Sequence, residues 1–179
     1  MNFFRKHIAR KIVIIFLLFL NLFLQTSVAA WFSPHAIFPN FFVILTSLIG
    51  FLNGKKAGIF TGLISGVLVD LYSTTPFGFH ILCLVYIGYC SGYLKRTFYH
   101  DDVVLPSLLV GACDFVYNLV MFVFFFLLQG NTGFNYYFVH TIFPDVLMTM
   151  LVTLLIYQFV HKVDQKITAY EKGKEVERD

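Results

Sequence analysis

Lysine and arginine occur in four short regions of the chain and are missing from the long apolar stretches between them. No Lys or Arg is found in residues 12–54, 57–94 or 97–161. If these stretches hold six membrane spans, all thirteen basic residues fall on one side of the membrane. Cytoplasmic loops collect Lys and Arg because cations are difficult to move across a bilayer during insertion. The pattern therefore predicts a multi-pass protein of a cytoplasmic (inner-type) membrane, with both termini in the cytoplasm.

The composition leaves no room for a separate soluble domain. Hydrophobic residues make up 58% of the 179 residues and charged residues 13%, whereas a soluble domain is roughly a quarter charged and less than half apolar. The net charge of +3 follows from the basic loops and gives no support for nucleic-acid binding. The lipid bilayer is the expected partner of these basic ends, and residues 1–179 are expected to form one membrane domain.

We expect an all-α fold with six transmembrane helices. A spanning helix needs roughly 20 predominantly apolar residues, whereas the strands of a membrane barrel would alternate apolar and polar residues in runs of about ten. The second run is short enough to be tilted or only partly spanning, and Pro39 suits its first helical turn. The expected spans are 12–32, 38–53, 57–72, 77–94, 103–128 and 139–160, followed by a cytoplasmic tail at 161–179 that is frayed or lies on the membrane surface.

The first run also resembles a signal peptide, which leaves cleavage open as an alternative. It has a basic start, an apolar core from Ile12 to Leu24 and the small residues Val28 and Ala30, as a secretory signal does. Apolar sequence continues into Trp31 and Phe32, however, and this favours a retained span.

Glycine recurs every four residues along the third run, at Gly54, Gly58, Gly62 and Gly66, and Asp70 completes the series. Residues four apart share one face of a helix, and a face of small residues lets another helix approach closely within lipid. We expect Gly58, Gly62, Gly66 and Asp70 to contact a helix of the same chain or of a partner protein. The two alternatives are compatible on different parts of the face.

Three carboxylates lie within or at the ends of the expected spans, namely Asp70, Asp114 and Asp145. An ionised Asp at the centre of a span costs roughly 2.5–3.5 kcal/mol, and no Lys or Arg lies within a span to form an ion pair. Asp114 is the deepest, and Asn118 lies one turn further along the same face. Asp114, Asn118 and Asp145 are therefore candidates for a polar cavity or proton site opening outward; the alternative is hydrogen bonding that fixes helix packing.

Metal binding and catalysis find little support in the sequence. His80 and His140 lie near the outer ends of spans, but nothing in their spacing indicates a metal site. Cys83, Cys90 and Cys113 lie within apolar runs, and neither their odd number nor their spacing suits a disulfide framework or a zinc site. The chain contains no zinc-protease, phosphate-loop or Cys-x-x-Cys motif. We expect no catalytic residue, no metal and no cofactor, and hence a protein that is not an enzyme.

Several features together resemble one family. A proline precedes the second span, in Phe38-Pro39-Asn40, and the glycine-rich third span ends in Asp70-Leu71 and is followed by Pro76-Phe77-Gly78. With fewer than 200 residues, about six spans and a basic start, the chain resembles the rod shape-determining protein MreD family. The motif-like identity lies in residues 39–95, whereas the fifth and sixth spans match in hydropathy alone.

The resemblance implies a component of the cell-elongation machinery in the bacterial cytoplasmic membrane. Such proteins work with the single-span protein MreC, the actin-like MreB filament, and the peptidoglycan polymerase and transpeptidase pair. We therefore expect a membrane scaffold needed for rod cell shape. The six-helix design is also similar to the substrate-binding subunits of energy-coupling-factor vitamin transporters. A small-solute transporter subunit, with a pocket near Asp70, Asp114 and Asn118, is thus the alternative function.

Overall fold

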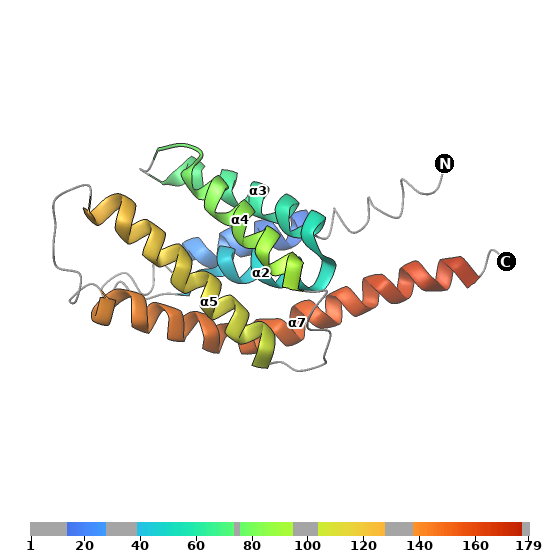
Figure 1. Ribbon diagram of the computed structural model, residues 1–179. Coiled ribbons are helices and arrows are strands. Elements are labelled where there is room, and N and C mark those ends of the chain that lie inside the picture. Colours follow the sequence, from blue (N-terminus) through green and yellow to red (C-terminus); the bar gives the residue numbers. More distant parts are fainter. Residues whose placement is uncertain (1–13, 28–38, 74–75, 95–103, 128–137, 177–179) are drawn as a thin grey trace.

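The computed structural model describes residues 14–27, 39–73, 76–94, 104–127 and 138–176 (Figure 1). Every regular element among these residues is a helix, which confirms the expected all-α fold. The elements in chain order are the N-terminal helix Ile14–Ser27, α2 (Phe41–Asn53), α3 (Lys55–Tyr72), α4 (Phe79–Leu94), α5 (Val104–Met121), the π-helical turn η1 (Phe122–Leu127), the π-helical turn η2 (Phe138–Ile142) and α7 (Phe143–Val176).

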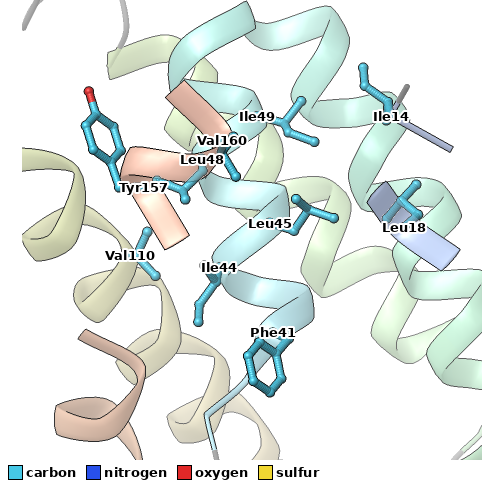
Figure 2. Packing of buried hydrophobic residues seen from close by; sticks show 10 residues of the cluster. All are labelled: Ile14, Leu18, Phe41, Ile44, Leu45, Leu48, Ile49, Val110, Tyr157 and Val160. Carbon is cyan, nitrogen blue, oxygen red and sulfur yellow. The ribbon is translucent and has the colours of Figure 1, made fainter. Parts of the chain in front are cut away.

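Helix α2 forms the centre of the molecule. Every residue from Phe41 to Phe51 is buried, as expected for a helix that is hydrophobic on all sides. Its side chains pack against the N-terminal helix on one side and against Val110 of α5 and Val160 of α7 on the other (Figure 2). Thirteen residues span only about 20 Å, less than the ~30 Å hydrocarbon core. Because other helices enclose α2, its length need not match the bilayer.

The start of α2 differs from the expectation in one detail. Pro39 was expected in the first helical turn, but the helix begins at Phe41 and Asn40 is its N-cap. The Asn40 side chain accepts a hydrogen bond from the Val43 amide at 3.3 Å. Asparagine is among the strongest N-cap residues because its side chain satisfies one of the free amide groups of the first turn. Pro39 therefore precedes the cap and lies outside the helix.

A single residue, Gly54, connects α2 to α3. Its φ of 91° lies in a region that side chains other than glycine rarely adopt. The Gly54 amide donates to the Gly50 carbonyl at 2.7 Å, and the Gly54 carbonyl accepts from the Gly58 amide at 3.0 Å. The chain thus reverses with almost no loop, so Lys55 and Lys56 lie at the tip of a tight helical hairpin.

Helices α5 and α7 form a second antiparallel pair beside α2 (Figure 1). Ser107 of α5 donates a hydrogen bond to the Met150 carbonyl of α7 at 3.3 Å. A Cβ atom added to Gly111 would come within 2.6 Å of the Met150 side chain, so glycine permits this close approach. Helix α7 continues from Phe143 to Val176, so the expected tail prolongs the helix of the sixth span and is not a separate element.

The distribution of apolar and polar residues is that of a protein whose solvent is lipid. Large apolar side chains such as Phe16, Leu82 and Leu155 are exposed on the outside, whereas Thr61 and Ser65 are completely buried. In soluble domains, by contrast, Ser and Thr are mostly exposed and Leu and Phe are among the residues most often buried.

Length and composition identify two stretches that can cross a membrane, Val104–Phe124 and Phe138–Lys162. The shorter apolar helices are Ile14–Ser27, α2 and α4. The count of six spans therefore remains a prediction.

Candidate functional site

The glycine face of α3 lies against the backbone of α4. A Cβ atom added to Gly58 would overlap the Gly88 carbonyl, and one added to Gly62 would overlap the Leu84 carbonyl. At Gly66 the added atom would overlap the Ile81 backbone. The two helices run antiparallel and side by side along their length (Figure 1). Of the two sequence alternatives for this face, the structure therefore shows the contact within the chain.

Glycines that the sequence interpretation did not single out complete the same contact. A Cβ atom on Gly50 of α2 would lie 2.8 Å from the Gly88 carbonyl, and one on Gly88 would overlap the Gly58 carbonyl. Gly92 lies similarly close to the backbone at Lys55. The spacing of Gly88 and Gly92, four residues apart in the fourth apolar run, was a signal that could have revealed the partner of α3.

Asp70 caps the start of α4 from the last turn of α3. Its carboxylate accepts hydrogen bonds from the backbone amides of Gly78 at 2.8 Å, His80 at 3.3 Å and Ile81 at 3.4 Å. The first amides of a helix have no partner within the helix, and the positive end of the helix dipole favours an anion there. Gly78 has a φ of 101°, so glycine suits the turn that brings these amides to Asp70.

His80 extends this connection to α5. Its Nδ1 atom lies 2.8 Å from the Tyr117 hydroxyl, and the two rings are tilted toward each other with centroids 6.0 Å apart. His80 is buried, so the imidazole has little access to solvent. A chain of polar contacts therefore runs from α3 through the start of α4 to α5.

Asp114, Asn118 and Asp145 come together at the contact between α5 and α7. The Asn118 amide donates to Asp145 Oδ2 at 2.9 Å and to the Asp114 backbone carbonyl at 3.1 Å. The Asp114 side chain is fully buried, and neither of its carboxylate oxygens has a hydrogen-bond partner. The buried Thr149 hydroxyl lies beside that carboxylate without reaching bonding geometry.

Neither the histidines nor the cysteines form a metal centre in the part of the chain that the structure describes. No three His, Cys, Asp or Glu side chains come together there. Cys83, Cys90 and Cys113 are free thiols, and Cys113 Sγ lies 3.6 Å from the Ser91 hydroxyl.

The comparison with known families decides the identity of the chain. The sequence profile of the rod shape-determining protein MreD matches residues 5–167. The chain belongs to the MreD family. This confirms the resemblance seen in the sequence. No curated protein and no solved structure matches the chain.

Membership of the MreD family establishes a membrane protein with a role in determining rod cell shape. The motifs that carried the resemblance occupy one structural unit. The glycine face of α3 contacts α4, Asp70 caps α4, and Gly78 forms the intervening turn. The MreD-like motif thus encodes the α3–α4 hairpin.

Sequence interpretation missed a second polar group in this MreD-family protein, around the start of α2. Asn21 and Gln25 of the N-terminal helix bind the backbone of Phe41: the Asn21 amide donates to its carbonyl at 2.9 Å, and Gln25 Oε1 accepts from its amide at 3.0 Å. The backbone amide of Asn40 donates to the Thr149 hydroxyl at 3.2 Å. The sequence did contain a signal for these contacts, namely two amide side chains four residues apart in an apolar run. Lipid offers such groups no partner, so they must bind elsewhere in the protein.

Proposed function

We propose that this chain is a non-enzymatic membrane scaffold of the bacterial cell-elongation and peptidoglycan-synthesis machinery. Family membership supports the role in rod shape. The contact between the α3 glycines and the α4 backbone is the observation that favours a scaffold. Since an added methyl group at Gly62 has no space, α3 and α4 are fixed in one arrangement. A rigid helical unit is suited to holding partners in a defined orientation.

Two buried polar residues of the α3–α4 unit, Asp70 and His80, are used in contacts within the chain. Asp70 is engaged by three backbone amides, and His80 pairs with Tyr117. Because α4 covers the glycine face, we propose that a single-span MreC-like protein binds another apolar face of the molecule. The exposed side chains of α4, including Leu82, Tyr86 and Tyr93, provide one such face.

We further propose six spans with both termini in the cytoplasm, as the distribution of Lys and Arg indicates. The Lys55 ammonium group lies 4.3 Å from the centre of the Tyr93 ring and 5.3 Å from that of Tyr89. Tyrosine and lysine with this arrangement are typical of the membrane–water interface. This end of the α3–α4 hairpin would therefore lie at the cytoplasmic surface, near an MreB-type filament.

Affinity purification from native membranes in mild detergent tests the scaffold. We expect an MreC-like single-span protein and the wall polymerase and transpeptidase pair to co-purify with the tagged chain. Depletion of the chain should make rod-shaped cells round, and re-expression should restore the rod. Normal rod shape after depletion, together with purification of the chain alone, would contradict the proposal.

A small-solute transporter subunit is the second candidate, because the Asp114 carboxylate is buried without a partner. It predicts saturable binding of a small solute to the purified chain and loss of that binding in Asp114→Ala. It also predicts that a transport ATPase pair and its membrane coupling subunit co-purify with the chain. Their recovery in place of the wall enzymes would support the transporter and reject the scaffold.

A further inference from the structure

The Asp114 carboxylate lacks the partner that a buried charged group requires. Its side chain is 0% exposed, and both oxygens are without a hydrogen bond. The carboxylates of Asp70 and Asp145, by contrast, are each held by at least one donor. A buried polar group without a hydrogen bond destabilises a fold, and an unpaired charge destabilises it much more. The Thr149 hydroxyl beside Asp114 is neutral and does not compensate a full negative charge, so the site lacks a positive charge.

The surroundings of Asp114 are rich in oxygen atoms. The Asp145 carboxylate on α7 is near enough for the two like charges to interact, and the Thr149 hydroxyl lies beside Asp114. Asn118 connects the two helices by donating to Asp145 at 2.9 Å. Oxygen ligands of this kind suit a proton or a hard metal cation, whereas softer metals prefer nitrogen and sulfur.

Helix α5 and the part of α7 that surrounds the site carry no positive charge, since residues 97–161 contain no Lys or Arg. One added positive charge is sufficient, because the Asn118 amide already stabilises Asp145 whereas Asp114 has no donor. We propose that Asp114 and Asp145 form a site between α5 and α7 that binds one small monovalent cation, either a proton or a sodium ion. This inference is independent of the proposed scaffold function.

Other titratable groups near the site must be separated from it in any pH experiment. On α5, Cys113 and Tyr117 lie near enough to Asp114 to interact with it, and Tyr117 contacts His80 on α4. The adjoining turn η2 carries His140. Helix α2 and its N-cap contribute neutral side chains, with Asn40 beside Tyr117 and Ser47 beside Cys113. A pH effect that belongs to the proposed site must therefore disappear when Asp114 is replaced and change when Asp145 is replaced.

Two measurements on the full chain in lipid nanodiscs test the proposal. The first compares the thermal unfolding temperature in sodium, potassium and choline chloride at equal ionic strength. The second uses infrared spectroscopy to detect the C=O stretching band of a protonated carboxylic acid at alkaline pH. We expect either an unfolding temperature several degrees higher in sodium, which identifies a sodium ion, or a protonated carboxyl band, which identifies a proton.

Isosteric variants assign the signal to the site. Asp114→Asn should abolish the sodium effect or the carboxyl band. Asp145→Asn should abolish the sodium effect or change the pH at which the carboxyl band disappears, because the neighbouring negative charge is gone. Asp70→Asn should retain either signal because Asp70 is held by backbone amides. Using two site variants keeps the test valid if one of them fails to fold. The proposal is overturned if the wild-type chain shows neither signal, or if both site variants retain the signal unchanged.

Discussion

The Asp70 carboxylate accepts a hydrogen bond from the Gly78 amide at 2.8 Å, so the last turn of α3 caps the first turn of α4. Within a bilayer, water is not available to satisfy the free amides at a helix end, and each unsatisfied group costs several kcal/mol. A carboxylate is also better matched than a neutral acceptor to the positive end of a helix. The connection between α3 and α4 therefore depends on one buried side chain.

Replacing Asp70 by alanine should destabilise the α3–α4 hairpin. Three amides would lose their acceptor, and loss of a helix cap costs about 0.5–2 kcal/mol. We expect a lower thermal unfolding temperature of the purified chain in detergent. Asp70→Asn retains an acceptor oxygen and should recover part of the loss. Equal stability of Asp70→Ala and wild type would show that the cap is dispensable.

Gly62→Ala should destabilise the chain because the added methyl group would overlap the Leu84 carbonyl. To make room for the methyl group, α3 and α4 must move apart and lose packing around the contact. Overpacking of this kind lowers the free energy of unfolding by about 1–3 kcal/mol. Thermal unfolding in detergent measures the loss. The matched control is Leu63→Ala, since Leu63 is the next residue along α3 and is exposed. If both variants unfold at the wild-type temperature, the close contact of α3 with α4 is not required.

The cap of α2 gives a third prediction. Asn40→Ala should lower the stability by about 1 kcal/mol, because the Val43 amide loses its acceptor. Asn53→Ala is the control, since Asn53 is the last residue of the same helix. The C-terminus of a helix has free carbonyls and no free amides, so the Asn53 side chain cannot act as an N-cap there. Unfolding by denaturant should separate the two variants. Equal destabilisation by both would argue against a capping role for Asn40.

Hydropathy and charge predicted much of the architecture but not which helices touch. The all-α fold and the MreD family followed from the apolar runs and from the motif around Gly62 and Asp70. The α5–α7 contact could not be predicted, because Asn118 and Asp145 are 27 residues apart and hydropathy carries no information on pairing. The enclosure of α2 was equally hidden, since a buried helix and a lipid-facing helix have the same composition.

Carboxylates and neutral amides within the apolar runs both form contacts that fix helices. A charged group is costly in lipid, and this cost predicted that Asp70 needs a partner. The partner is the backbone at Gly78 and His80, which agrees with the alternative of hydrogen bonding that fixes helix packing. The amide side chains of Asn21 and Gln25 were overlooked, yet they bind the start of the central helix. Neutral amides within apolar runs are thus as informative as carboxylates.

The orientation of the chain can be tested with single cysteines on the two sides of the predicted membrane. Because the α2–α3 connection carries Lys55 and Lys56, it should lie in the cytoplasm, whereas the uncharged connection between the fifth and sixth spans should lie outside. In a background in which the three native cysteines are replaced by alanine, a membrane-impermeant maleimide should label Gly133→Cys in intact cells. Lys55→Cys should be labelled only after the membrane is opened. Labelling of both positions from the same side would reject the six-span arrangement, because an odd number of spans separates these positions in that topology.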